Sequence, residues 1–439
     1  MSHFDNVLPL TCDAVESSPI ADYLTSVTII RDLQGKVRLV FEFPPDPDGN
    51  DLLPPNWQPE KERLENRLAA ELGPYWGAQI WRSGRRRDIA FRAMRRTIEQ
   101  QRQSWPTAPH VSGRFEWYKL ERQFSKSSWN RTNLEPPWPL TDASNPAIIS
   151  FYSFKGGVGR TTVVAAIAIL LAQAGKRTLV LDLDLEAPGV GPLMLENMSL
   201  PDDGIVDYLL EYQLLKSRPA NLDPYVAEQN HPDLIGSGAP LQVMTAGQLN
   251  ANFIEKLARL DFEHFINQET NPLVDFLFHA NEEYDLDFIL LDLRSGLHDL
   301  GGLSLNGLSH LDVLFGTETE QSWAGLELVL NFLTRSTPRR EALLVHAMNP
   351  LTLFDPEGLT HQRFQNRGQN LFGSNYYDVH ETIPDIEDPS APYAFPINYN
   401  PLLININRLS RVVSIFTEPT GDYTALARTL GTFLERDTI

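Results

Sequence analysis

The chain has 439 residues, of which 42% are hydrophobic and 21% charged, and its formal net charge at pH 7 is −20. This length predicts two domains, and the ordinary globular composition excludes a chain that is disordered throughout. Cys12 is the only cysteine, which excludes an intrachain disulfide, argues against a cysteine-based metal site and fits a reducing cytoplasm.

The ends and apolar runs of the chain indicate where it resides. Residues 1–10 contain acids and a proline instead of the basic region and apolar stretch of a secretory signal. The longest apolar run, residues 163–172, is about half of what crosses a bilayer. We therefore expect a soluble, cytoplasmic protein that does not attach to a membrane.

Residues 1–143 are predicted to form a small α/β accessory domain. Strands are expected at 24–30 and 36–43, a helix at 60–72, a short strand at 78–81 and a basic helix at 86–103. The aromatic and basic run 115–129 is interpreted as a packing surface between domains. Four prolines, at positions 136, 137, 139 and 146, indicate a linker and place the domain boundary near residue 143.

Charge separates the two parts of the chain. Residues 1–150 hold 19 basic and 19 acidic residues, whereas residues 151–439 hold 18 basic and 38 acidic ones, which disfavours nucleic acid as a partner of the second part. An arginine cluster lies within the neutral part and comprises Arg82, Arg85, Arg86, Arg87, Arg92, Arg95, Arg96 and Arg102. The cluster suits a nucleic acid or acidic partner, but a solvated helix face or docking on the acidic domain fits at least as well.

Residues 144–439 alternate strands with helices. Strands are predicted at 147–153, 178–183, 242–246, 287–292, 311–316 and 342–348, and a last helix at 423–435. These strands are apolar almost throughout, which is typical of parallel strands covered on both faces. The fold class expected is α/β, a doubly wound, mostly parallel sheet whose ligand loops lie at the carboxyl ends of the strands.

A glycine-rich turn follows the first of these strands and opens a helix at 163–174. Strand, glycine-rich turn and helix in this order predict a phosphate-binding loop. The backbone N–H groups expected to surround the phosphates are those of Gly156, Gly157, Val158, Gly159, Arg160, Thr161 and Thr162. Arg160 stands where a lysine is usual, and the Thr161 hydroxyl is a candidate ligand of Mg²⁺.

Three motifs in order resemble the deviant Walker A (SIMIBI) branch of P-loop ATPases, the ParA/MinD type. Residues 155–162, KGGVGRTT, are most similar to its variant subgroup that reads KGGVGR. Residues 178–189 resemble the second-strand motif of that subgroup, and residues 284–292 resemble a Walker B strand followed by a switch-like turn at 294–296. The resemblance implies a P-loop NTPase fold that binds ATP and Mg²⁺.

The resemblance also implies roles for individual residues. Lys155 matches the signature lysine that reaches the partner's nucleotide, which implies a homodimer across the nucleotide. Asp184 matches the switch I acid needed for hydrolysis, and Asp292 matches the Walker B acid. Thr161, Asp184 and Asp292 would together hold Mg²⁺. Asn349 resembles an adenine-contacting asparagine, although an ordinary turn asparagine fits nearly as well.

Three functions are compatible with the sequence. The first is an ATP-binding and slowly hydrolysing dimerisation switch that regulates a partner protein through the N-terminal domain, with bacterial antiviral defence or signalling as the setting that the resemblance implies. The second is a nucleotide-binding scaffold without turnover, because an arginine at position 160 is not a conservative replacement of lysine. The third, a DNA-partitioning ATPase, has only the arginine cluster in its favour.

Overall fold

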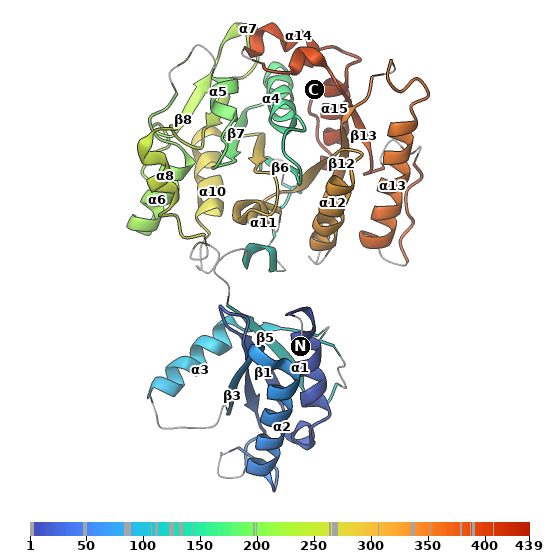
Figure 1. Ribbon diagram of the computed structural model, residues 1–439. Coiled ribbons are helices and arrows are strands. Elements are labelled where there is room, and N and C mark those ends of the chain that lie inside the picture. The colour runs from blue at the N-terminus through green and yellow to red at the C-terminus, as the bar shows by residue number, and fades with distance from the viewer. Residues whose placement is uncertain are drawn as a thin grey trace. The chain divides into compact units, whose positions relative to one another are not determined.

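The computed structural model describes most of the chain in two compact units, Met1–Phe124 and Ser125–Ile439, each of which is considered by itself (Figure 1). The residues described are 4–46, 51–82, 89–106, 108–109, 113–122, 127–130, 135–142, 144–195, 198, 200–262, 265, 271–305, 307–334, 339–351, 353–377, 380–386, 388, 391–406 and 408–439.

The first unit is a mixed five-stranded sheet with helices on both faces. Its elements are α1 (Val7–Glu16), β1 (Ser26–Arg31), β2 (Val37–Glu42), α2 (Trp57–Leu72), β3 (Trp76–Arg82), α3 (Ile89–Gln101), β4 (Gln103–Ser104) and β5 (Glu116–Glu121). The strand order is β3-β2-β1-β5-β4, and β1 pairs antiparallel with β2 and parallel with β5.

Alternate residues of β1 pack into the two cores of this unit. Val27 and Ile29 pack with Leu64 and Leu68 of α2 on one face, whereas Ile30 packs with Ile98 of α3 on the other. This is the period-two alternation expected of a strand covered on both sides. The predicted order of two strands, helix, strand and helix is present.

Three elements of the first unit, α1, β4 and β5, were not predicted. Residues 116–121 form β5, and the indole of Trp117 is buried in the core of this unit. Trp117, within the run 115–129 that was interpreted as a packing surface between domains, therefore packs inside the first unit instead. The strand was missed because β1, which pairs with it along its whole length, lies far away in the sequence.

The second unit is built on an eight-stranded sheet in the order β13-β12-β11-β6-β10-β7-β9-β8. Its strands are β6 (Ala147–Ser153), β7 (Thr178–Leu183), β8 (Val226–Gln229), β9 (Leu241–Met244), β10 (Phe288–Leu293), β11 (Leu311–Gly316), β12 (Glu341–Asn349) and β13 (Phe395–Asn398). All neighbours pair in parallel except β8 with β9.

Helices cover both faces of this sheet (Figure 1). They are α4 (Arg160–Gln173), α5 (Val190–Met194), α6 (Ile205–Leu215), α7 (Pro232–Ile235), α8 (Ala251–Leu257), α10 (Pro272–Tyr284), α11 (Asp299–Leu305), α12 (Glu320–Leu333), α13 (Leu359–Asn375), α14 (Val413–Phe416) and α15 (Asp422–Leu434). The buried side chains of α4 and α15 pack on one face of the sheet, and those of α10 and α12 pack on the other. The predicted doubly wound α/β fold, preceded by a small α/β unit, is confirmed.

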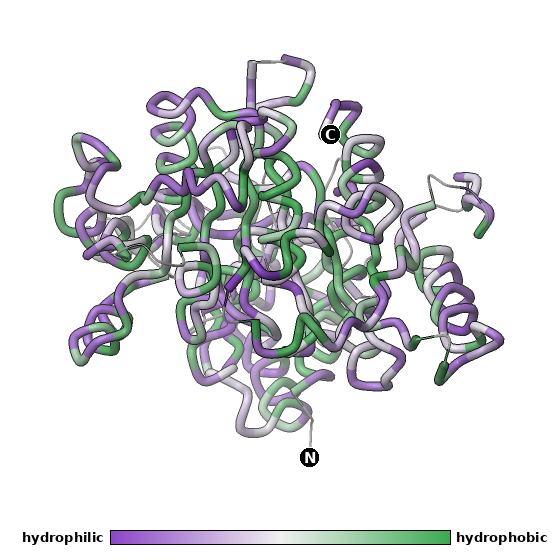
Figure 2. The backbone as a smooth tube through the Cα atoms, turned by 90° about the horizontal axis from the view of Figure 1, so that it is seen from above, coloured by the Kyte–Doolittle hydropathy of each residue, from purple (hydrophilic) through white to green (hydrophobic). Residues whose placement is uncertain are grey.

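Burial in the second unit explains the apolar character of its strands. Every residue of β6, β7, β10 and β11 is buried, and hydrophobic segments run through the interior of the backbone view while hydrophilic ones gather toward its edge (Figure 2). All six predicted strands are present. The sequence pattern missed β8, β13 and α13, which are short or polar and lie at the edges of the sheet.

No helix among the described residues is both long and apolar enough to cross a membrane.

Candidate functional site

The glycine-rich loop lies at the carboxyl end of β6 and leads directly into α4. Gly157 and Gly159 have φ angles of +73° and +81°, in the left-handed region that favours glycine. Gly159 is the residue before the first turn of α4, so the N–H groups of the loop and of the helix N-terminus lie at one end of the sheet. The loop therefore has the backbone geometry of an anion-binding turn.

Close packing fixes the start of this loop. A Cβ atom at Gly325 of α12 would lie only 2.0 Å from Cγ of Phe154. The ring of Phe154 consequently occupies space that exists because residue 325 has no side chain. Phe154 stands where the usual motif has a glycine, and it anchors the loop on α12.

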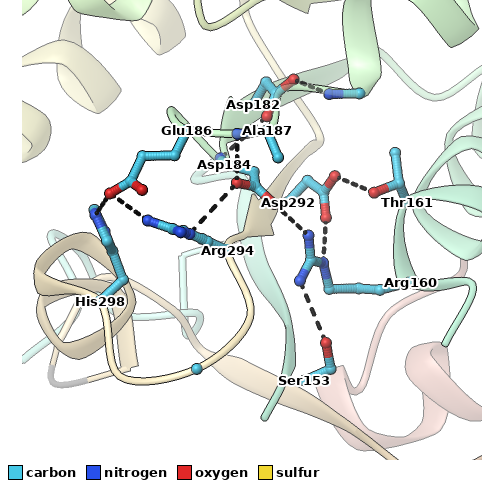
Figure 3. A network of polar contacts seen from close by, with 12 residues as sticks. Ser153, Arg160, Thr161, Asp182, Asp184, Glu186, Ala187, Asp292, Arg294 and His298 are labelled. Carbon is cyan, nitrogen blue, oxygen red and sulfur yellow. Dashed lines mark hydrogen bonds and ion pairs between the residues drawn. The ribbon is translucent and has the colours of Figure 1, made fainter. Parts of the chain in front are cut away.

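Arg160, the first residue of α4, points into a group of acids instead of away from the protein. Its Nε donates to Oδ1 of Asp292 at 2.6 Å, and Nη2 donates to Oδ2 of Asp184 at 3.2 Å (Figure 3). Nη1 also donates to Oγ of Ser153 at 3.3 Å. The Arg160 residue is 8% exposed. Its guanidinium thus forms a buried, three-partner contact beneath the loop.

The two acids that bind Arg160 come from neighbouring strands. Asp292 lies near the carboxyl end of β10 and Asp184 directly after β7, and these strands pair in parallel. Thr161 Oγ1 donates to Oδ2 of Asp292 at 2.7 Å. The structure thus brings together three of the predicted residues, Thr161, Asp184 and Asp292, around the Arg160 side chain.

Asp182 lies within β7, two residues before Asp184, and its hydrogen bonds differ from those of Asp184. Its carboxylate accepts the N–H groups of Asp184, Gly189 and Val190 at 3.1, 3.1 and 3.0 Å. Burial, and then the nearby charge of Asp292, raise the pKa of Asp182 to about 8. Burial also raises the pKa of Asp292, against the opposing charge of Arg160. Asp182 therefore shapes the turn after β7.

A second arginine lies on the far side of Asp184. Arg294 Nε is 4.0 Å from Oδ1 of Asp184, and its Nη1 pairs with Glu186 (Figure 3). His298 Nε2 lies 3.2 Å from the same Glu186 oxygen. Glu186 and Arg294 were part of motifs read from the sequence, but their pairing was not predicted. Their position at the ends of adjacent strands was the signal available.

Two predicted residues lie outside this network. Lys155 is half-buried on the loop and forms no hydrogen bond or ion pair with the described residues. Asn349 ends β12, and its Nδ2 donates to Oδ1 of Asn398 at 2.8 Å. Oδ1 of Asn349 is buried without a hydrogen-bond partner among the described residues, so this amide has an acceptor available.

Cavities lined by described residues adjoin the loop end of the sheet. One of about 60 Å³ lies beside Gly159 and Thr162 and is lined by Phe315, Met348 and Asn398. One of about 540 Å³ has Asp182 in its wall, and one of about 450 Å³ is lined by Glu186, Arg294 and His298. Residues of the polar network, namely Asp182, Glu186 and Arg294, thus line two of these cavities.

The residues present fit a magnesium ion that also binds a phosphate ligand. A hydroxyl and two carboxylates converge here, and Mg²⁺ is commonly held by one or two carboxylates with substrate phosphates and water. Among the described residues, no three His, Cys, Asp or Glu side chains are grouped as metal ligands, so this site lacks an all-protein cage. Arg160 at present occupies one oxygen of Asp292 and one of Asp184.

The arginine cluster of the first unit is only partly described. Arg85, Arg86 and Arg87 lie outside the described residues. Arg102 stacks over the Tyr118 ring at 3.9 Å and pairs with Glu42 at 3.1 Å, and Arg95 pairs with Glu99 at 2.6 Å. Arg82 lies 3.9 Å from Asp51, so three of the cluster's charges have acidic partners within the unit itself.

Comparison with known proteins matches part of the second unit to a family model. Residues 146–340 match the family model described as an AAA domain. The uncharacterized protein Rv1708 of Mycobacterium tuberculosis is 25% identical over 251 residues, which cover 55% of this chain and 69% of that protein.

Two solved structures are similar to the chain. A ParA family ATPase from Chlorobium tepidum is 16% identical, with a TM-score of 0.43 over 67% of this chain and 99% of that one. A chain of the MinC:MinD cell division protein complex of Aquifex aeolicus is 18% identical, with a TM-score of 0.42 over 66% of this chain and 97% of that one.

Proposed function

We propose that residues 146–340, which match the AAA-domain family model, form a P-loop ATPase domain of the ParA/MinD type, and that the protein is an ATP-dependent dimerisation switch that regulates a partner protein. The observation that carries this proposal is that the two cationic side chains at the loop differ in their partners. Arg160 is paired with acids of its own subunit, whereas Lys155 has no ion-pair partner among the described residues.

Backbone groups provide the phosphate site. The N–H groups of residues 156–162 lie in a turn with two left-handed glycines and at the N-terminus of α4. Such an arrangement attracts phosphate oxygens through aligned N–H dipoles without a change of structure. Asn349, with an acceptor available at the end of β12, is the candidate to bind the exocyclic amine of adenine.

Thr161, Asp184 and Asp292 are proposed to hold Mg²⁺. The ion supplies positive charge that neutralises the phosphates during transfer. Arg160 occupies one oxygen of each carboxylate, so it competes with the ion for both. A buried guanidinium with three partners does not move readily, so we expect hydrolysis to be slow.

Lys155 is proposed to act across a homodimer. A lysine ammonium in a half-buried position without a counterion favours an anion. In the dimer this anion would be the nucleotide phosphate of the partner subunit, which would make association depend on the triphosphate. The unit Met1–Phe124 would then present the nucleotide state to a partner protein, with a defence or signalling system as the proposed setting.

A scaffold that binds nucleotide without turnover is the second candidate. The contact of Arg160 with both Asp184 and Asp292 favours it, because these are the acids proposed to act in hydrolysis. A DNA-partitioning ATPase is less favoured, since Arg95 and Arg102 already have partners and the second part of the chain is strongly acidic.

Mass photometry with ADP, ATP and a non-hydrolysable ATP analogue tests the switch, run beside a phosphate-release assay. We expect dimers with ATP and the analogue, monomers with ADP, and loss of the dimer in Lys155→Ala. Lys176→Ala, which removes a lysine at the opposite end of the sheet, is the matched control. A wild-type protein that stays monomeric with every nucleotide would refute the switch, and dimers without phosphate release would favour the scaffold.

A further inference from the structure

Asp184 lies between two arginines that differ in their freedom to move. Arg160 approaches one of its oxygens at 3.2 Å and Arg294 approaches the other at 4.0 Å (Figure 3). The Arg160 side chain is 8% exposed and has three polar partners. The Arg294 side chain is 30% exposed, and its partner Glu186 is 45% exposed.

Exposure decides which arginine can turn to a ligand. A partly exposed ion pair is weak, typically less than about 1 kcal/mol, because water and salt screen it. A buried pair leaves an uncompensated charge when it breaks. Arg294 can therefore leave Glu186 at small cost, whereas Arg160 is held beneath the loop.

The backbone turn that carries Arg294 lies directly on the glycine-rich loop. The Gly296 N–H donates to the Ser153 carbonyl at 3.2 Å, and Tyr152 Oη donates to the Gly296 carbonyl at 3.0 Å. A Cβ at Gly156 would lie 3.2 Å from Oγ of Ser295. These contacts fix the backbone turn that carries Arg294 beside the loop, and Arg294 also lines the cavity of about 450 Å³.

We propose that Arg294 binds the terminal phosphate of a nucleoside triphosphate within its own subunit. The planar guanidinium can donate two parallel hydrogen bonds to phosphate oxygens. Arg160 stands where a lysine is usual but is paired with acids, so the phosphate site otherwise lacks the cation that this lysine would supply. Glu186, itself in contact with His298, holds Arg294 near the loop until the triphosphate arrives. Arg160 then acts as a positioning residue that fixes Asp184 and Asp292. This inference rests on the proposed nucleotide site.

Equilibrium affinity for two nucleotides tests the role of Arg294. Calorimetry with Mg²⁺ compares ADP with a non-hydrolysable ATP analogue for wild type, Arg294→Gln and Arg294→Lys. We expect Arg294→Gln to lose about ten- to a hundredfold in affinity for the ATP analogue, the usual size of a hydrogen bond to a charged group, while ADP affinity changes less than about twofold. Arg294→Lys should recover part of the loss.

Controls separate the inference from the proposed function. Arg177→Ala removes an exposed arginine paired with Asp285 and Asp287 at the opposite end of the sheet, and it should change neither affinity. A wild-type protein that binds neither nucleotide would overturn the nucleotide site and the inference with it. If wild type binds both and Arg294→Gln keeps the preference for the ATP analogue, or Arg294→Lys is no better than Arg294→Gln, only the role of Arg294 fails.

Discussion

Arg160 Nε donates a 2.6 Å hydrogen bond to Oδ1 of Asp292, so the cation at the start of α4 and the acid near the end of β10 neutralise each other. Asp292 is completely buried, and Arg160 nearly so. Each charge has lost its water and depends on the other for compensation. The pair explains why an arginine at this position shapes the site even before any ligand binds.

Arg160→Ala is expected to destabilise the protein strongly. Removal of one partner of a buried pair leaves the other charge uncompensated, and this costs about 3–5 kcal/mol. Chemical unfolding monitored by circular dichroism measures the loss. Arg177→Ala, at an exposed pair, should change the free energy of unfolding by less than about 1 kcal/mol. Equal effects of the two substitutions would contradict this account of Arg160.

Magnesium without nucleotide should stabilise Arg160→Ala but not the wild type. In the variant, one oxygen each of Asp292 and Asp184 loses its arginine partner, and an ion that binds only the folded state raises the melting temperature by mass action. Thermal scans at several Mg²⁺ concentrations measure the shift. The double variant Arg160→Ala, Asp292→Asn is the control and should respond less. A similar response of wild type would show that Arg160 does not compete for these carboxylates.

Gly325→Ala is expected to disturb the loop from a distance. The added methyl would meet Phe154 Cγ at 2.0 Å, and overpacking of this kind costs about 1–3 kcal/mol. Because Phe154 begins the loop, nucleotide affinity should fall as well, which calorimetry measures.

Gly301→Ala is the matched control for this substitution. Gly301 is also a buried helical glycine, but a Cβ there meets only ordinary contacts at 3.7 Å. Alanine favours a helix over glycine by about 1 kcal/mol, so this variant should be neutral or more stable. Should Gly325→Ala bind nucleotide as well as Gly301→Ala does, Phe154 does not anchor the loop.

His310 should make stability depend on pH. Its Nδ1 accepts the Ile148 N–H at 2.9 Å, and its Nε2 lies 2.8 Å from the Trp138 carbonyl. Burial lowers the pKa of His310 to about 4 from its ordinary value of 6.5, and the charges of Arg340 and Arg436 act in the same direction. The folded state therefore holds fewer protons than the unfolded state between these two values.

The free energy of unfolding should therefore fall as the pH is lowered. The stability that neutral His310 contributes is present above pH 6.5 and is lost as the pH falls toward 4, about 2 kcal/mol by pH 5. His310→Gln keeps a donor and an acceptor but does not titrate. Urea unfolding at pH 7.5 and pH 5 should show a smaller loss for this variant than for wild type, and equal losses would exclude His310 as the source.

Much of the second unit was predictable because its signals are local. The strands are continuous apolar runs, and the glycine-rich turn stands between a strand and a helix. The fold class follows from their alternation. The edge strands β8 and β13 escaped prediction because each has only four residues, and α13 escaped it because the helix is largely polar. The strand β5 escaped it for another reason, because it pairs with β1 across about 90 residues.

Part of the candidate site could also be predicted from the sequence. Thr161, Asp184 and Asp292 could be placed together because carboxyl ends of adjacent parallel strands meet at one edge of a sheet. The catalytic and ligand roles of these residues, of Lys155 and of Asn349, remain predictions that the experiments above address.

The sequence by itself determined that a glycine-rich turn opens α4 and that acids lie at the carboxyl ends of β7 and β10, since backbone conformation and strand order are encoded by nearby residues. Only the tertiary structure decided where the charges go: Arg160 turns inward to Asp184 and Asp292, Arg294 rests on Glu186, and Phe154 fills the space beside Gly325. Side-chain partners depend on distances across strands and on burial, and a linear pattern of residues contains neither.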